Sequence, residues 1–340
     1  MAIEIRATGK AVPPQRISND ELASRIDTSD EWIRSHTGIR ARHIAADDVA
    51  GSDLAVEAAF NALSMAAGGG EIPEKTVEEI LPTVDLVIVG TTSPDYFGCP
   101  STACLVQNRL GAKNAAALDV NAACSSFIYG IEAAAGMLLA GEKRRRALVI
   151  GTEVLSRIVD WNDRSICVLF GDGAGAVFLE KTRAEGKRGL LRTVLGADGS
   201  GAEHLIIRRG GGRSPIKNGE TVENRPHVEM NGQAVYNFAV KAVTETIEEL
   251  LRQEGITIND VSRIVPHQAN ARIVQAAAKR LNIGEEKFFL NIEEYANTSS
   301  ASIPIALDEL NRKGNIRRGD LIMTVGFGAG LTYGGNLVVW

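Results

Sequence analysis

The sequence predicts an α/β fold built from two similar halves, and three observations lead to this prediction. Short apolar segments alternate with segments typical of helices along most of the chain, a pattern that indicates sheets covered by helices. The same order of segments recurs about 175 residues later. The chain is 44% hydrophobic but only 5% aromatic, so we expect a core of Ala, Val, Ile and Leu. The two halves are assigned to residues 1–180 and 181–340.

The first half begins with an alternating strand at residues 1–6. Helix start signals follow at Ser18 and at Thr28, where Glu31 completes the spacing of a capping box. An Ala-rich helix is expected over 51–66. The remaining elements are strands at 86–90, 117–120, 146–151 and 171–179, with helices over 100–110 and 124–139.

The second half repeats this order, with strands expected at 264–266, 288–292, 321–326 and 330–339 and helices over 271–281 and 300–310. In this register the strand-to-helix junction that holds Cys124 corresponds to the junction that holds Asn297. His267 lies at the end of the strand that matches 86–90. Because sites in open α/β sheets collect at the carboxyl ends of strands, we expect these three side chains to converge.

Charge and cysteine usage limit the classes of function. A net charge of −5 argues against general binding to nucleic acid or to an anionic membrane. The chain shows no secretion signal, and no apolar run is expected to span a bilayer, so a cytoplasmic protein with reduced thiols is predicted. The four cysteines have no metal-ligand spacing. Cys104, within a helix, and Cys167, within a strand, are interpreted as core residues.

Cys124, His267 and Asn297 offer a thiol, an imidazole and a carboxamide, a set suited to acyl transfer through a thioester. At the N-terminus of a helix, Cys124 is expected to have a lowered pKa that favours the thiolate. Each residue also has a simpler interpretation: a small buried hydrophobe for Cys124, a structural histidine for His267 and a helix N-cap for Asn297. The remaining histidines are interpreted as surface or loop residues, with a possible exception for His36.

At these residues the sequence resembles the β-ketoacyl-acyl carrier protein synthase III family, initiating condensing enzymes of the thiolase superfamily. The resemblance rests on residues 27–33 and 37–40, on Pro-His-Gln-Ala-Asn at 266–270, on Asn-Thr-Ser at 297–299 and on the glycine-rich segment 326–334. It implies a thiolase-like, five-layered αβαβα arrangement with two mixed sheets, and a homodimer.

The resemblance also implies a reaction. Cys124 would accept an acyl group from acyl-CoA, and the backbone N–H groups of Cys124 and Ala329 would hold the oxyanion. Malonyl-acyl carrier protein would then lose CO₂, His267 and Asn297 would hold the enolate, and Phe327 would form an apolar wall. Acyl-CoA is a substrate here, and no metal or prosthetic group is expected.

Two groups of binding residues follow from the same resemblance. The predicted contacts with CoA are Trp32, Arg164, His36, Gly232, Gln233 and Asn270, with Trp32 and Arg164 sandwiching the adenine. The predicted contacts with the acidic carrier protein are Gln268, Arg272, Lys279 and Arg280, of which the last three share one helix face. The glycine-rich run 171–175 leads into an apolar strand and is interpreted as tight packing, not as a phosphate loop.

Several positions depart from the family pattern. His36 stands where relatives usually have arginine, and Gln233 and Asn237 replace Asn and Lys. Cys99 replaces a bulkier phenylalanine of some relatives that reaches across the dimer, so we expect primers longer than acetyl to be accepted. Ser126 and Ala296 replace glycines, and both are expected to add bulk near the site and to alter the acyl pocket.

Three functions stay open from the sequence. The first is initiation of type II fatty acid synthesis. The second is a related priming synthase or acyltransferase of a polyketide or other secondary pathway, which would share all these residues. The third is a non-catalytic scaffold subunit, which we disfavour because such a subunit should have lost its nucleophile or one donor, and this chain retains all three.

Overall fold

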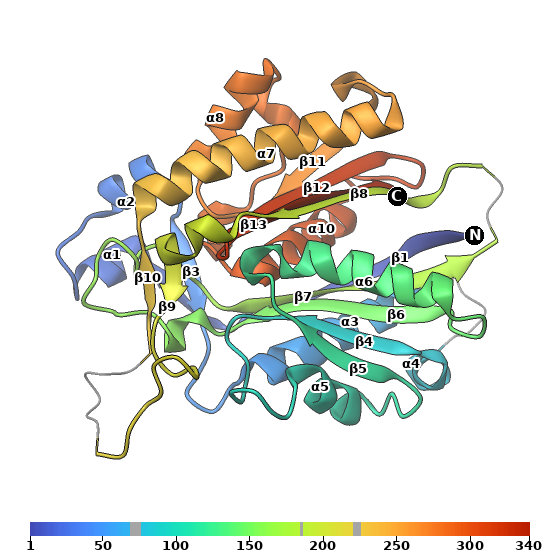
Figure 1. Ribbon diagram of the computed structural model, residues 1–340, viewed down its shortest axis with the longest axis horizontal. Helices are drawn as coiled ribbons and strands as arrows, with labels where there is room; N and C mark the ends of the chain where they lie inside the picture. The colour runs from blue at the N-terminus through green and yellow to red at the C-terminus, as the bar shows by residue number, and fades with distance from the viewer. Residues whose placement is uncertain (69–75, 184–185, 220–225) are drawn as a thin grey trace.

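The fold is a stack of five layers, in which two sheets alternate with three layers of helices (Figure 1). The computed structural model describes residues 1–68, 76–183, 186–219 and 226–340. Both chain ends lie at the same end of the stack, and a smaller group of helices and strands covers the opposite end (Figure 1).

The first sheet has the strand order β1-β7-β6-β4-β5. Its parallel part consists of β6 (Arg146–Glu153), β4 (Leu86–Gly90) and β5 (Ala116–Val120). The other two strands, β7 (Gly173–Thr182) and β1 (Ala2–Ala11), run antiparallel to their neighbours. Every residue of β4 and β6 is buried, as expected for strands covered by helices on both faces.

The second sheet repeats this arrangement with the order β8-β13-β12-β11. Its strands are β8 (Gly189–Ala197), β13 (Thr332–Val339), β12 (Leu321–Gly328) and β11 (Arg263–Pro266). They correspond in order and direction to β1, β7, β6 and β4. The chain is therefore duplicated in topology.

The strand expected at 288–292 is wrong. A single parallel bridge joins Phe288 to Ile264, at the position that corresponds to β5, and the chain then turns into the short helix α9 (Ile292–Tyr295). Phe288 and Ile292 are buried by packing and not by a continuous ladder, while Leu290 between them is 37% exposed.

Helices cover both faces of each sheet (Figure 1). The first sheet carries α3 (Gly51–Gly68) and α5 (Thr102–Leu110) outside, with the short α4 (Val77–Ile80) beside them, and the second sheet carries α7 (Gly232–Glu254) and α8 (Ala271–Leu281). Between the sheets lie α6 (Ser126–Ala140) and α10 (Ser302–Arg312), which contact both. One apolar core includes residues from both halves, such as Ile88 and Ile322. The expected boundary at residue 180 falls just inside the end of β7.

The smaller group at the end of the stack contains α1 (Asn19–Ala23), α2 (Asp30–Thr37), β2 (Gln15–Ser18), β3 (Ala41–Ile44), β9 (Leu205–Ile207) and β10 (Val228–Met230). The N-cap of α2 is Ser29, whose hydroxyl accepts a hydrogen bond from Trp32 N, and not the expected Thr28. The shift by one residue leaves Trp32 in the first turn.

Three further expectations need correction. Residues Ala123–Ala140 are long and apolar enough to cross a membrane, but 61% of this stretch is buried inside the fold. Its apolar surface packs between the two sheets, so it reflects a core position. Cys104 is exposed on α5 and not in the core, while Cys167 is buried but lies in a series of turns and not in a strand.

Candidate active site

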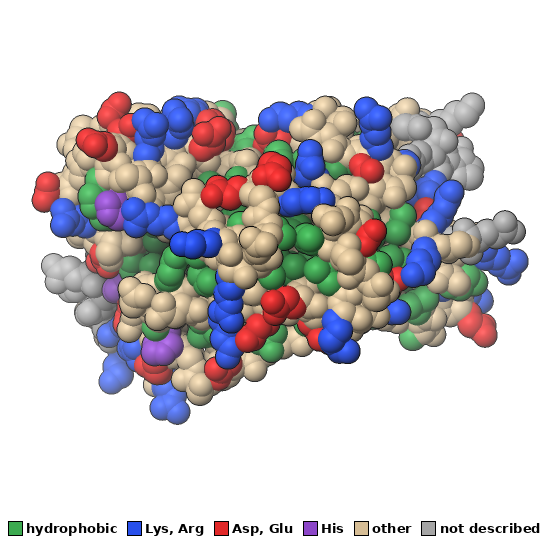
Figure 2. Space-filling model, turned by 90° about the horizontal axis from the view of Figure 1, so that it is seen from above, with side chains coloured by type: hydrophobic (Ala, Val, Ile, Leu, Met, Phe, Trp, Pro, Cys, Tyr) green, Lys and Arg blue, Asp and Glu red, His purple; other side chains and the backbone are tan. Residues whose placement is uncertain are grey.

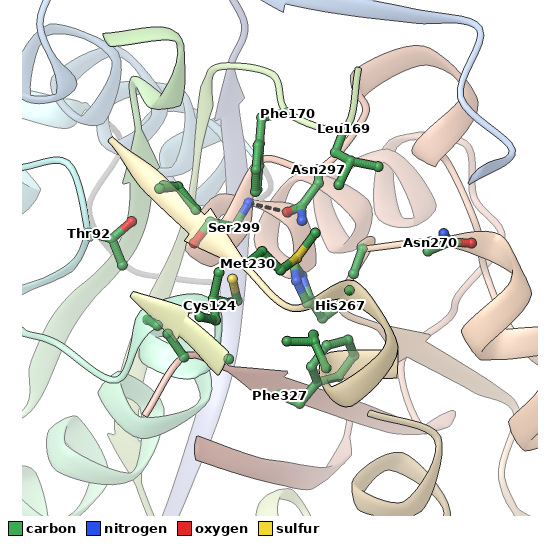
Figure 3. Close-up of a pocket in the computed structure, with 18 of the residues that line it drawn as sticks. Thr92, Cys124, Leu169, Phe170, Met230, His267, Asn270, Asn297, Ser299 and Phe327 are labelled. Atoms are coloured by element: carbon green, nitrogen blue, oxygen red, sulfur yellow. Dashed lines mark hydrogen bonds between the residues drawn. The ribbon is translucent and has the colours of Figure 1, made fainter. Parts of the chain in front are cut away.

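The three predicted functional side chains line one cavity of about 710 Å³. Cys124, His267 and Asn297 reach it from three different segments, and Phe327 and Ala329 line the same space (Figure 3). A volume of this size is typical of sites for small molecules. The convergence expected from the duplicated fold is therefore present.

Cys124 lies in a 3₁₀ turn, Ala123–Ser125, that leads directly into α6. Ala123 has a φ of 49°, an unusual value for a residue with a side chain, which marks a sharp turn in front of the nucleophile. Ser126 closes this turn, because its hydroxyl accepts from Ala122 N and donates to Ala123 O. Ser126 is fully buried and does not line the cavity, so its expected effect on the acyl pocket is wrong.

The Cys124 thiol has a raised pKa and not the lowered pKa that the sequence predicts. Burial raises its pKa to about 12; the Ser299 hydroxyl lowers this pKa, and the negative charge of Glu153 raises it further. The expected lowering by the helix N-terminus is therefore outweighed. In the free protein the residue is a thiol at neutral pH, and its proton must be removed before or during attack.

His267 follows β11, whose proline ends the strand, and its ring is almost completely buried. Ser302 Oγ lies 2.7 Å from His267 Nδ1 and accepts a hydrogen bond from Gln268 N at 3.3 Å. The hydrogen of Ser302 is therefore available for Nδ1, which assigns the ring hydrogen to Nε2. Burial lowers the pKa of His267 to about 3, so the ring is neutral at physiological pH.

Asn297 is held on both sides of its peptide: its N–H donates to Leu169 O, and its carbonyl accepts from Gly171 N. Its side-chain oxygen accepts a 2.8 Å hydrogen bond from Ser299 N. This bond, drawn in Figure 3, orients the carboxamide so that its NH₂ group is free to donate into the cavity.

The cavity wall beside His267 is apolar. The ring of Phe327 meets His267 edge-on, with centroids 5.3 Å apart. Gly328 follows, and a Cβ at that position would come within 2.6 Å of Cys124 N. The absence of a side chain therefore lets the segment that carries Ala329 approach the backbone of the nucleophile.

The predicted CoA residues divide into two groups. Trp32, His36, Gly232 and Asn270 line the cavity. Arg164 and Gln233 do not line the cavity. Arg164 is exposed and donates to Asp27 O. Gln233 donates to Asn237 Oδ1, so the two residues that depart from the family pattern here contact each other.

His36 stacks on Trp32, with ring centroids 4.4 Å apart and planes 18° apart. Trp32 itself is 40% exposed. One face of the indole is therefore covered by imidazole, and a second planar group can stack only on the other face. Asn270 connects this helix to α8 by donating to His36 O and accepting from Arg272 N.

Of the predicted carrier-protein contacts, Arg272, Lys279 and Arg280 are exposed on α8. Gln268 is 2% exposed, and its side chain donates to Pro266 O and Phe289 O and accepts from Asn291 N. The prediction for Gln268 is therefore wrong: its side chain ties together three loops in the interior. Figure 2, which looks onto the α7 and α8 side, shows basic and acidic side chains interspersed over this face.

Cys99 is exposed on the loop before α5 and does not line the cavity of its own chain.

Sequence reasoning missed four residues around the site: Thr92, Glu153, Ser299 and Ser302. Their roles depend on contacts between segments far apart in the chain, which the local pattern does not reveal. Among the described residues, no cluster of three or more His, Cys, Asp or Glu could hold a metal ion.

Comparison with known proteins gives the family of this chain. Residues 118–199 match the family described as 3-oxoacyl-[acyl-carrier-protein (ACP)] synthase III, and residues 251–340 match its C-terminal part. A β-ketoacyl-[acyl-carrier-protein] synthase III of Clostridium acetobutylicum is 44% identical over 339 residues, covering 100% of this chain and 99% of its own. This chain belongs to the β-ketoacyl-acyl carrier protein synthase III family.

Other members are equally similar to this synthase. The enzyme of Caldanaerobacter subterraneus subsp. tengcongensis is 46% identical over 341 residues, covering 100% of this chain and 98% of its own. The crystal structure of the Aquifex aeolicus VF5 enzyme has a TM-score of 0.88 and 41% identity, and each chain is covered in full. The expected thiolase-like fold is confirmed, and the protein is an acyl-transferring condensing enzyme of fatty acid biosynthesis.

The priming β-ketosynthase of the R1128 polyketide pathway also has a TM-score of 0.88. Its identity is lower, at 33%, with 99% of this chain and 96% of that chain covered. The identities thus favour fatty acid synthesis over the polyketide alternative.

Proposed function

We propose that this synthase joins an acyl-CoA primer to malonyl-acyl carrier protein by decarboxylative Claisen condensation, with Cys124 as the acyl carrier. The observation that supports this most strongly is the orientation of the two donors. Ser302 forms a hydrogen bond with Nδ1 of His267, and the backbone N–H of Ser299 donates to Oδ1 of Asn297. His267 and Asn297 therefore each keep an N–H group that can donate into the cavity, which Cys124 also lines.

In the first half-reaction, the sulfur of Cys124 attacks the thioester carbonyl, and CoA leaves as the acyl-enzyme forms. The carbonyl oxygen gains negative charge, and the N–H groups of Cys124 and Ala329 hold it. The close approach of the Gly328 segment to Cys124 N supports this pairing of donors.

In the second half-reaction, the malonyl carboxylate leaves as CO₂, and the electron pair of the broken C–C bond forms an enolate. Nε2–H of His267 and the NH₂ group of Asn297 donate to the enolate oxygen. Phe327 offers the carboxylate no hydrogen bond, which favours its loss. The enolate carbon then attacks the acyl-enzyme, and the β-ketoacyl product leaves on the carrier protein. No metal or prosthetic group takes part in the proposed reaction.

Substrates would enter past Trp32 and His36, since both line the cavity and Trp32 is partly exposed. Arg164 would have to leave its bonds with Asp27 to stack on adenine, and Gln233 would contact CoA only outside the cavity. The exposed Arg272, Lys279 and Arg280 on α8 would attract the acidic carrier protein.

We also propose a cytoplasmic homodimer. Within the described residues, β5 is an edge strand that pairs with β4 alone, and it is partly exposed although mostly apolar. Phe97, on the loop near it, is 72% exposed. A second copy placed against this edge would cover both features. Molar-mass measurement by light scattering should therefore give about twice 36.3 kDa.

Cys99 would act in this dimer. Because it does not line the cavity of its own chain, it could border the acyl pocket only of the partner subunit. A cysteine leaves more space there than a phenylalanine would, so we expect butyryl-CoA and octanoyl-CoA to be turned over as well as acetyl-CoA. A strict preference for acetyl-CoA would contradict this proposal.

The experiment that tests the assigned roles separates the two half-reactions. His267→Ala and Asn297→Ala should still form the acyl-enzyme at Cys124, while malonyl decarboxylation falls about 10²–10³-fold in each, as for loss of one oxyanion donor. CoA release and CO₂ release are measured on the same samples. Equal loss of both half-reactions would contradict the division of roles.

A further inference from the structure

Glu153 is a fully buried carboxylate at the end of β6, directly behind the site. One oxygen, Oε2, accepts from the hydroxyl of Ser93 at 2.6 Å, from the hydroxyl of Thr92 at 3.0 Å and from both backbone N–H groups. The other oxygen, Oε1, accepts from Ser300 Oγ at 2.8 Å. The carboxylate thus joins the end of β4 to the turn that carries Asn297.

Within the described residues, every hydrogen bond to Glu153 comes from a hydroxyl or a backbone N–H group, and no Lys or Arg forms an ion pair with it. Burial raises the pKa of Glu153, although the surrounding hydroxyl and N–H groups lower it. A buried charge without a counter-charge is costly to keep in a fold. Its place beside a nucleophile indicates a functional reason for keeping it.

Ser299 connects the surroundings of Glu153 to the cavity. The next residue, Ser300, bonds Glu153, and the 3₁₀ turn that begins at Ser299 packs against the turn that carries Cys124. Ser299 is 2% exposed and lines the cavity with Cys124 (Figure 3), and its hydroxyl has no hydrogen-bond partner among the described residues, so it is free to turn toward either group. Ser299 has a φ of 46°, a conformation that the surrounding structure must hold in place.

We propose that Glu153, acting through the Ser299 hydroxyl, removes the proton of Cys124 when the thiol attacks an acyl thioester. The Cys124 proton passes to Ser299 Oγ as the Ser299 hydroxyl proton passes to Glu153, and the sulfur forms its bond to the acyl carbon. The C–S bond of the acyl-CoA breaks, and CoA leaves as a thiolate that takes a proton from water. Glu153 is a positioning residue here, since it acts on Cys124 only through Ser299.

The second half-reaction returns the proton. When the enolate carbon attacks the acyl-enzyme, the bond between the acyl carbon and the sulfur breaks and Cys124 leaves as a thiolate. The proton stored on Glu153 then passes back through Ser299, and Cys124 is again a thiol. The proposal rests on the proposed role of Cys124 as nucleophile and adds the route of its proton.

The pH dependence of acylation tests this route. With Glu153 as proton acceptor, the wild-type rate should level off once Glu153 is ionised. In Ser299→Ala only the thiolate can react, and its fraction rises tenfold per pH unit below the thiol pKa of about 12. The single-turnover rate of CoA release should therefore rise tenfold per unit from pH 6 to 9, and at pH 7 it should be about 10²-fold below wild type.

Two histidines also line the cavity, and neither confuses this readout. His36 is present in wild type and in every variant, so it cannot cause a difference between their profiles. His267, from β11, is neutral throughout this pH range because its pKa is about 3. The β4 loop and the Asn297 turn contribute only hydroxyl, amide and backbone groups toward Glu153 and Cys124. Glu153→Gln should show the same rising profile, shifted to lower pH, because the charge that raises the thiol pKa is gone.

Two controls separate proton transfer from simple support of the fold. Ser156→Ala removes a similar 2.6 Å bond from a serine to a buried carboxylate, Asp172, and should leave the shape of the profile unchanged. In a Cys124→Ala background, which has no thiol, Ser299→Ala and Glu153→Gln should lower malonyl decarboxylation far less than they lower CoA release in the parent protein.

Three results would overturn the proposal: a Ser299→Ala profile that levels off as in wild type, a wild-type profile that already rises tenfold per unit, or an equal loss of decarboxylation in the Cys124→Ala background. The last would mean that Glu153 serves only to hold the Asn297 turn. If wild-type protein is never acylated at Cys124, the proposed function itself fails, which is a distinct result.

Discussion

At the scale of single residues, the chemistry of the site depends on which polar atoms already have hydrogen bonds within the protein. Ser302 is hydrogen-bonded to Nδ1 of His267, and a backbone N–H donates to Oδ1 of Asn297, so the imidazole and the carboxamide can only donate into the cavity. Cys124 differs, because burial keeps it as a thiol. Because His267 and Asn297 act only as hydrogen-bond donors, the second half-reaction needs no proton from His267. Because Cys124 is protonated, the first half-reaction needs a group that accepts its proton.

The low pKa of His267 leads to a prediction about pH. Because this pKa is about 3, the imidazole stays neutral, with its hydrogen on Nε2, from pH 8 down to pH 5. Malonyl decarboxylation, followed by CO₂ release in a Cys124→Ala variant, should therefore be nearly constant over this range. A change of rate in either direction with a midpoint near 6.5, the ordinary pKa of histidine, would contradict the assignment.

At this scale the sequence could indicate residue types but not their environments. Cys124, His267 and Asn297 stand out because each follows a predicted strand, although in the structure Asn297 follows the short helix α9. The pKa of Cys124 could not be predicted, since it depends on Glu153 and Ser299, which are distant in sequence. The burial of Gln268 was missed because an amide beside a surface helix gives no sign of its three partners inside the fold.

At the scale of elements, the functional residues lie in strained junctions. Ala123, Ala296 and Ser299 all have positive φ values, and each is adjacent to or near a functional residue. The sequence located the strands and helices on either side of these junctions well, since apolar patterning determines them. It missed the loss of the 288–292 strand, because a buried apolar segment has the same composition whether or not it pairs.

Ala296 offers a test of this strain. Its φ of 55° and ψ of −155° are values that glycine adopts freely and alanine does not. Ala296→Gly should remove about 1–3 kcal/mol of strain, less about 0.5–1 kcal/mol for the added freedom of glycine in the unfolded chain and about 0.8 kcal/mol for the loss of a fully buried methyl group. The free energy of unfolding, measured in urea, should therefore change by no more than about 1 kcal/mol.

A matched control is Ala301→Gly, at a position with an ordinary helical φ of −79°. This variant should lower the free energy of unfolding by about 1.5 kcal/mol, because glycine adds entropy to the unfolded chain and a fully buried methyl group is lost. If Ala296→Gly is destabilised as much as Ala301→Gly, the junction before Asn297 is not strained.

At the scale of the whole molecule, duplication explains how distant residues meet. Cys124 follows β5, and Asn297 lies at the corresponding place of the second half, after the single bridge of Phe288, so that both line one cavity. The two halves also share a core between the sheets. The repeat of strand order was predictable from the sequence. The packing of one half against the other was not predictable, because it depends on close contacts between backbone segments. At Gly151, for example, a Cβ would come within 2.2 Å of Ser300 O.

The surface of α8 carries a prediction about the carrier protein. Arg272→Glu and Lys279→Glu should raise the KM for malonyl-acyl carrier protein about tenfold at low salt, and less at high salt, because exposed charges are screened. The rate of acylation by acyl-CoA should not change. Lys143→Glu, an exposed charge on the turn before β6, is the matched control and should change neither. Equal losses in both half-reactions would argue against docking at α8.

The central claim is that Cys124 carries the acyl group between the two half-reactions, and intact-mass spectrometry tests it most directly. Purified protein is mixed with acetyl-, butyryl- or octanoyl-CoA, its mass is measured, and malonyl-acyl carrier protein is then added. We expect one acyl group per chain, located at Cys124 by peptide mapping, and its complete transfer to the carrier protein as a β-ketoacyl thioester. Acylation at Cys99, Cys104 or Cys167, or an acyl group that malonyl-acyl carrier protein does not discharge, would contradict the account.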